Sequence, residues 1–200
     1  MSNQEKRKLR YKLAFAVRVA TVPPVMVGIL LLLLYLYRKD LFGAPVDMIV
    51  SACLLTVLPM LAYPLSVMIP ALRKKGREGQ RSLAMYLSAA GYPAVFVYGI
   101  IADVGVGLMH LYGGYLLSVI IILIGNKLLH IRISGHACAV SGPLVYTAWY
   151  LGLWGAFTGA ALWGIILWAS LAMKRHTVKE FLLGTATCLV AFAVSLLVFH

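Results

Sequence analysis

Apolar residues run along most of the chain in long stretches that only short polar or basic segments interrupt. A helix needs about 20 apolar residues to cross the hydrocarbon core of a bilayer. The pattern therefore predicts an all-α, polytopic integral membrane helical bundle with six to seven transmembrane helices. The candidate spans are 14–37, 46–70, 83–103, 106–125, 138–154, 156–173 and 181–199.

The number of transmembrane helices is given as six to seven because of the stretch from 137 to 174. It must hold two short helices, and we expect a tight hairpin near 154–156, with tryptophans toward the segment ends. We divide the chain into a basic N-terminal segment, 1–13, and one transmembrane domain, 14–200. No cleavage pattern follows the first apolar run, so we expect it to remain as an anchor.

Basic residues predict the orientation of the bundle. Of the 18 lysines and arginines, sixteen are expected on one side, in the N-terminal segment, at Arg18 just beyond it, and in or near the loops 71–82, 126–136 and 174–180, whereas Arg38 and Lys39 fall on the other side. The positive-inside rule makes these parts cytoplasmic in a protein of the cell membrane. The net charge of +12 does not indicate a nucleic-acid partner, because the basic residues border apolar spans and are not interleaved with aromatic residues on a soluble surface.

Cysteines and histidines give no sign of a metal or cofactor. Cys53, Cys138 and Cys188 stand singly in apolar segments, and the five histidines lack the spacing of zinc ligands. We therefore predict neither a disulfide, a metal nor another cofactor. His110 and His200 are expected at the membrane interface.

The first polar cluster that could carry chemistry is the loop from Lys74 to Arg81. Lys74, Arg77 and Arg81 could bind phosphate oxygens, and two glycines let the backbone bend around a ligand. The alternative is an ordinary basic loop that contacts anionic headgroups.

The second cluster, Arg132 to His136, comes directly before an apolar run. Ser134 is a good N-cap, and the free N–H groups of a helix start bind anions, with Gly135 and His136 in the first turn. The alternative is a capped helix with an interfacial histidine.

The third cluster runs from Lys174 to Glu180. His176 and Glu180 are four residues apart, so on a helix the carboxylate can accept a hydrogen bond from the imidazole. Thr177 and Glu180 also form a capping-box pattern, which would engage Glu180 with the backbone. The two roles compete for one carboxylate, and the sequence leaves both open.

Together the clusters resemble the membrane type 2 phosphatidic acid phosphatase superfamily. Its first motif is Lys, six residues, Arg, Pro, matched by Lys74 and Arg81 with Ser82 for the proline. Its second, Pro-Ser-Gly-His, reads Ile133 to His136 here. Its third is Ser-Arg, five residues, His, three residues, Asp, where this chain has Ala169, Ser170, His176 and Glu180.

The resemblance implies a metal-independent hydrolase of lipid monophosphates or diphosphates. His176 would be the nucleophile, oriented by Glu180, and His136 the acid. The phosphate would be bound by the following groups: Lys74, Arg77, Arg81, Ser134 and the Gly135 amide, with Arg132, Lys174, Arg175 or Arg77 supplying the charge that Ser170 lacks. The alternative is a catalytically inactive homologue that binds anionic lipid or serves as a membrane partner subunit. A transporter ranks last, because the predicted spans lack the buried ionisable residues and the broken-helix symmetry that transporters use.

Overall fold

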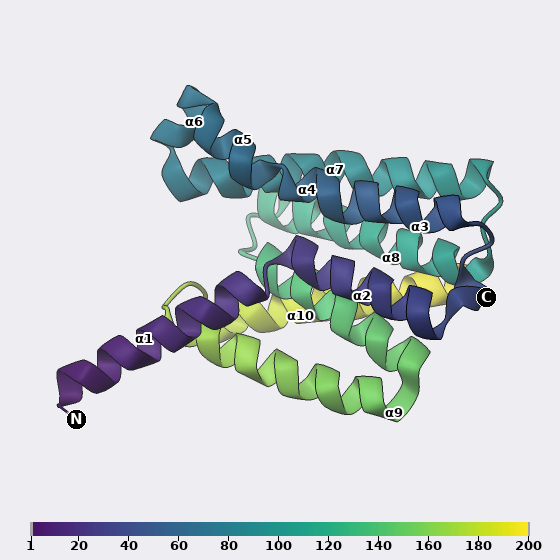
Figure 1. Ribbon diagram of the computed structural model, residues 1–200. Coiled ribbons are helices and arrows are strands. Elements are labelled where there is room, and N and C mark those ends of the chain that lie inside the picture. Colours follow the sequence, from purple (N-terminus) through teal and green to yellow (C-terminus); the bar gives the residue numbers. More distant parts are fainter. Residues whose placement is uncertain (1, 200) are drawn as a thin grey trace.

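Helices make up the regular structure of the protein. The computed structural model describes residues 2–199, and no strand occurs among them (Figure 1). The helices are α1 (Asn3–Ala20), α2 (Pro23–Tyr37), η1 (Lys39–Leu41), α3 (Pro45–Ala52), η2 (Cys53–Val57), α4 (Leu58–Met60), α5 (Ala62–Met68), α6 (Pro70–Lys74), α7 (Gly76–Ile101), α8 (Val106–Leu123), η3 (Ile124–Leu128), α9 (Gly135–Ala172) and α10 (Val178–Val198). Five helices are long and apolar enough to cross a membrane, or up to six when α1 and α2 count as one bent span. The predicted all-α membrane bundle is confirmed.

The first predicted span is bent. α1 and α2 meet at an angle of 53°, and Pro23 and Pro24 stand in the first turn of α2. Proline has no N–H to continue the upstream helix, and it disfavours a helical conformation for the residue before it. The predicted boundary between 13 and 14 falls inside α1, which continues without a break from the basic segment into the apolar one.

Helix α9 contains the predicted hairpin. Its backbone turns at Gly152, where φ is 67° and ψ is −146°, and its two arms run in opposite directions (Figure 1). Glycine adopts a positive φ without the clash that a β-carbon would cause. Leu144 of the first arm and Ile166 of the second belong to one buried apolar cluster. The turn lies slightly before 154–156, and each of the seven predicted spans has a helical counterpart once the arms are counted separately.

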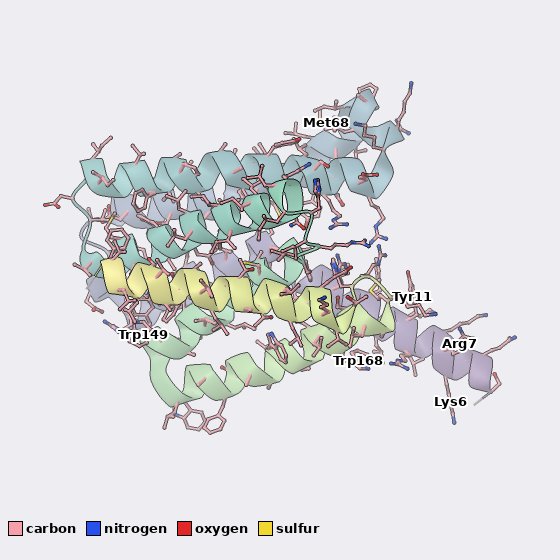
Figure 2. All side chains as sticks on the ribbon, turned by 180° about the vertical axis from the view of Figure 1, so that it is seen from behind. Lys6, Arg7, Tyr11, Met68, Trp149 and Trp168 are labelled. Atoms are coloured by element: carbon pink, nitrogen blue, oxygen red, sulfur yellow. The ribbon has the colours of Figure 1, made fainter. Side chains whose placement is uncertain are left out.

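The two ends of the bundle differ in charge. Lys6 and Arg7 lie on the part of α1 that projects beyond the bundle, whereas Trp149 lies near the opposite end (Figure 2). At that opposite end Arg38 pairs with Asp40 at 2.8 Å. The basic residues that the sequence assigns to one side of the membrane thus lie at one end of the bundle. We call this end, where α7, α9 and α10 start, the "basic end".

Helix α8 forms the centre of the bundle, in contact with both α7 and α10. His110 of α8 is 2% exposed, with Nε2 3.3 Å from the carbonyl oxygen of Phe192 and Nδ1 3.4 Å from the hydroxyl of Tyr150. His110, expected at the outer edge of a span, is thus enclosed by the bundle, where interior groups provide partners for both ring nitrogens. His200 lies outside the described residues.

We expect Gly184→Ala to destabilise the junction of α9 and α10. A β-carbon on Gly184 would meet the carbonyl oxygen of Ser134 and come within 2.9 Å of the β-carbon of Ala137. Backbone atoms of a helix can move aside only at a large energetic cost, so the free energy of unfolding should fall by about 1–3 kcal/mol. The measurement is the melting temperature in detergent, which should be lower. Gly164→Ala is the control, because its β-carbon would meet nothing within 4 Å. An equal loss in both variants would contradict this close packing.

Candidate active site

Arginines from distant parts of the chain gather around one cavity at the basic end. Its volume is about 410 Å³, and α1, α7 and the loops before α9 and α10 contribute to its walls. We call this cavity the cationic mouth, and its lining residues are Arg18, Arg77, Glu78, Arg81, Arg132, Arg175 and His176. Glu78 is the one carboxylate among the described residues that line it, so the mouth has the charge of an anion site.

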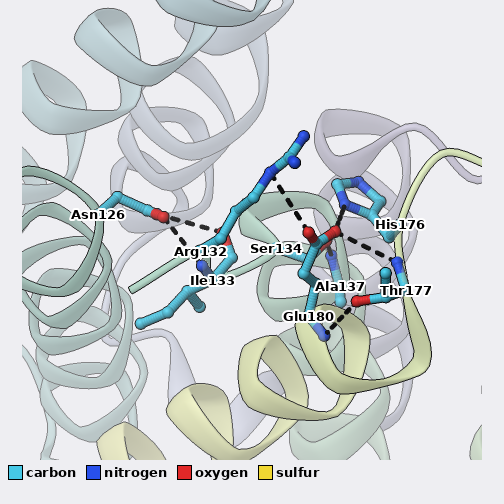
Figure 3. A network of polar contacts seen from close by, with 8 residues as sticks. All are labelled: Asn126, Arg132, Ile133, Ser134, Ala137, His176, Thr177 and Glu180. Carbon is cyan, nitrogen blue, oxygen red and sulfur yellow. Dashed lines mark hydrogen bonds and ion pairs between the residues drawn. The ribbon is translucent and has the colours of Figure 1, made fainter. Parts of the chain in front are cut away.

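Glu180 connects His176, the start of α10 and the segment before α9 (Figure 3). Its Oε2 accepts a hydrogen bond from the N–H of Thr177 and lies 3.2 Å from Nδ1 of His176. Its Oε1 lies 3.3 Å from Nε of Arg132. The N–H of Glu180 donates to Oγ1 of Thr177, which completes the capping box. The two roles that the sequence presents as competing therefore coexist, because one carboxylate oxygen serves both.

The surroundings of His176 favour its neutral form. Burial lowers the pKa of His176, the hydrogen bond with Glu180 opposes this shift, and the cations Arg81 and Arg18 lower the pKa further. When Nδ1–H donates to Glu180, Nε2 keeps its lone pair. The side chain of His176 is 8% exposed and lines the mouth. It therefore has the properties of a positioned nucleophile.

The start of α9 lies beside this pair, where the N–H of Ser134 donates to the carbonyl oxygen of Glu180 at 3.1 Å. Ser134 is 1% exposed, and its Oγ accepts a hydrogen bond from the helix backbone at 3.2 Å. It is the N-cap and lines neither cavity, whereas Gly135 and His136 line a larger cavity that continues inward from the mouth. The residues of this cluster that an anion in the cavities can reach are thus Arg132, Gly135 and His136.

Two basic residues differ from the sequence-based expectation. Lys74 is exposed at the end of α6 and lines neither cavity. Arg18, which we predicted only as a topology residue, lines both cavities, and its Nη1 is buried with no hydrogen-bond partner among the described residues. Its place inside a predicted span was the available signal, because ionisable residues at membrane depth tend to be functional.

Arg18 also lies near the position where the motif arginine is missing. Ala14, one turn earlier on the same face of α1, packs against Ala169. Ser170, which follows Ala169 and replaces the family's arginine, is 2% exposed, and its hydroxyl has no partner among the described residues. α1 thus brings a guanidinium to the part of α9 that lacks one.

The described residues contain no group of three or more His, Cys, Asp or Glu side chains that could hold a metal ion. Comparisons with models of protein families, with curated proteins and with solved structures find no match. The function must therefore be argued from the geometry of the site and the motifs in the sequence.

We expect Arg81→Ala to weaken the binding of inorganic phosphate by about tenfold to a hundredfold, because a hydrogen bond to a charged group contributes about 1.5–3 kcal/mol. Isothermal titration of the detergent-solubilised protein measures this affinity. Lys74→Ala removes the same charge outside the mouth and should change it less than about twofold. Equal weakening by both substitutions would contradict the mouth as the anion site.

Proposed function

We propose that this protein hydrolyses lipid phosphates or lipid pyrophosphates without a metal ion. The type 2 phosphatidic acid phosphatases, which its motifs resemble, catalyse this reaction. One observation carries the proposal. His176 is buried, hydrogen-bonded to Glu180, and lines a cavity that is cationic at its mouth and apolar deeper inside. A phosphate with an aliphatic tail matches that combination of surfaces.

The reaction begins with His176. Its Nε2 forms a bond to phosphorus while the bond from phosphorus to the lipid oxygen, or to the bridging oxygen of a diphosphate, breaks. Glu180 holds the ring and stabilises the positive charge that develops on it. His136, which lines the same inner cavity, donates a proton to the leaving oxygen.

Hydrolysis of the phosphohistidine completes the cycle. A water molecule attacks phosphorus, His136 accepts its proton, and the bond between phosphorus and Nε2 breaks, which releases phosphate and restores His176. The neutral form of His176 supports this cycle, because an imidazolium has no lone pair for the first step.

The arginines of the mouth stabilise the phosphoryl oxygens during both steps. Arg77, Arg81, Arg132 and Arg175 line the mouth from different elements, and the N–H of Gly135 adds a backbone donor at the start of α9. Arg18 takes the part of the arginine that the family pattern places at Ser170. Bidentate guanidinium contacts act most strongly where water is partly excluded.

We place the mouth on the cytoplasmic side of the cell membrane, together with the N-terminus. The support is the concentration of lysine and arginine at the basic end. A substrate would then present its headgroup to the mouth from the inner leaflet while its tail stays in an apolar environment.

His176→Ala should reduce phosphate release from lipid phosphates to the background rate, because no other group can form the covalent intermediate. The measurement is release of inorganic phosphate by purified protein from phosphatidic acid and from polyprenyl mono- and diphosphates, with EDTA present. His130→Asn is the control: His130 is exposed, lines neither cavity and has a φ of 53°, which asparagine tolerates.

Unchanged turnover in His176→Ala would rule out the proposed nucleophile. If folded wild-type protein binds these lipids but releases no phosphate from any of them, the protein is instead a lipid-binding homologue, and the absence of an arginine at Ser170 explains the loss of catalysis.

We expect Glu180→Gln to lower the maximal rate and shift the acid limb of the pH–rate profile to lower pH. Burial already lowers the pKa of His176 below its ordinary value near 6.5, and Glu180 opposes that shift, so its neutralisation lowers the pKa further. Glutamine preserves the capping box, which separates charge from helix stability. An acid limb that moves to higher pH would contradict the interaction of His176 with Glu180.

A further inference from the structure

The segment between α8 and α9 carries part of the site but has little packing of its own. It runs from Lys127 to Ser134, and residues 127–132 are all exposed. Burial against other parts of the protein therefore contributes little to the position of this stretch. Arg132, which lines the cationic mouth, belongs to it. The place of Arg132 thus depends on the hydrogen bonds that the segment forms.

Asn126 binds this segment through its side chain (Figure 3). Its Oδ1 accepts a hydrogen bond from the N–H of Ile133 at 2.9 Å, and its Nδ2 donates to the carbonyl oxygen of Ile133 at 3.2 Å. A carboxamide presents one acceptor and one donor side by side, so it can pair with both backbone groups of one residue, as an antiparallel strand does. The two bonds together fix the position of Ile133 relative to Asn126.

The backbone brings the segment within reach of Asn126. Residues Ile124–Leu128 form the π-helical turn η3 at the end of α8, and π-helical turns are rare and occur frequently at functional sites. The N–H of Ile131 donates to the carbonyl oxygen of Gly125 at 2.8 Å, so the chain folds back on this turn. A β-carbon on Gly125 would meet the side chain of Ile133. The segment therefore lies directly against the end of α8.

Arg132 stands between the two residues that are bound to η3. The side chain of Ile133 contacts η3 at Gly125, whereas Nε of Arg132 lies 3.3 Å from Oε1 of Glu180. The N–H of Ser134 donates to the carbonyl oxygen of Glu180. The segment is thus held by Asn126 on one side and by Glu180 on the other, and this places Arg132 at the mouth.

We propose that Asn126 is a positioning residue of the anion site and holds Arg132 in the cationic mouth. Asn126 acts through Arg132, whose guanidinium contacts the phosphoryl oxygens. This inference rests on the proposed function for its effect on turnover, and the binding of inorganic phosphate tests it without turnover.

A double-mutant cycle with inorganic phosphate tests the positioning role. Asn126→Ala should weaken phosphate binding by about threefold to tenfold, because Arg132 is then free to leave the mouth. In Arg132→Ala protein the same substitution should change the affinity by less than about twofold, since no guanidinium remains for Asn126 to position. Isothermal titration of the detergent-solubilised protein measures the four affinities.

Arg77→Ala provides the matched control background. Arg77 lines the mouth from α7, and no hydrogen bond joins it to Asn126 among the described residues. Asn126→Ala should therefore weaken phosphate binding in this background by the same factor as in wild type. An equal loss in all three backgrounds would show a general loosening of the site and overturn the proposal. Unchanged affinity in either Asn126→Ala or Arg132→Ala alone would also overturn it.

Asn126→Gln replaces Asn126→Ala in the cycle if the alanine variant does not fold. Glutamine carries the same carboxamide on a side chain that is longer by one methylene, so it cannot present both groups to Ile133 in the same geometry. It should give the same loss in wild type and the same absence of a loss in Arg132→Ala protein.

Phosphate release from lipid phosphates separates this inference from the proposed function. If the cycle shows the coupling of Asn126 with Arg132 but wild type hydrolyses no lipid phosphate, the proposed function fails and the positioning role stands. If wild type hydrolyses lipid phosphates and Asn126→Ala has the same kcat/KM, the positioning role fails. If wild type neither binds inorganic phosphate nor hydrolyses lipid phosphates, both fail.

Discussion

The structure of the basic end depends on the hydrogen bonds and the ion pair that the carboxylate of Glu180 forms. The first arm of α9 and helix α10 both begin beside Glu180, directly after the segments that carry Arg132, Arg175 and His176 into the cationic mouth. Glu180 accepts hydrogen bonds from the N–H of Thr177 and from His176, pairs with Arg132, and binds the N–H of Ser134 through its own carbonyl oxygen. One acidic residue thus joins the starts of two helices and orients His176.

Among the described residues, the other arginines of the mouth form no ion pair like the one between Arg132 and Glu180. Of the five arginines, Arg132 pairs with Glu180 and is largely exposed, whereas Arg18 keeps a buried nitrogen without a partner among the described residues. Such a cluster repels itself, and a bound anion would relieve the repulsion. The larger cavity behind the mouth is lined largely by apolar and aromatic residues, which suit a hydrocarbon. Charge and shape together therefore favour a ligand with an anionic head and an apolar tail.

Much of the site was predictable because it consists of local patterns. The spacing of His176 and Glu180 produces their contact on a single turn of helix, and Ser134 caps α9 for equally local reasons. Lys74 and Arg18 were not predictable in this way. Lys74 belongs to a short helix outside the mouth, and Arg18 reaches the mouth only because α1 bends at the prolines and packs on the second arm of α9.

The sequence by itself determined the membrane class, the helical spans, the hairpin and the separation of charge. Apolar length and the need to satisfy every backbone group within hydrocarbon leave few other solutions. Tertiary structure alone decided that His110 is buried, that Arg18 reaches the mouth, and that an apolar cavity continues inward from the mouth. Each of these depends on contacts between residues far apart in the chain, and helical periodicity carries no information about which faces of different helices meet.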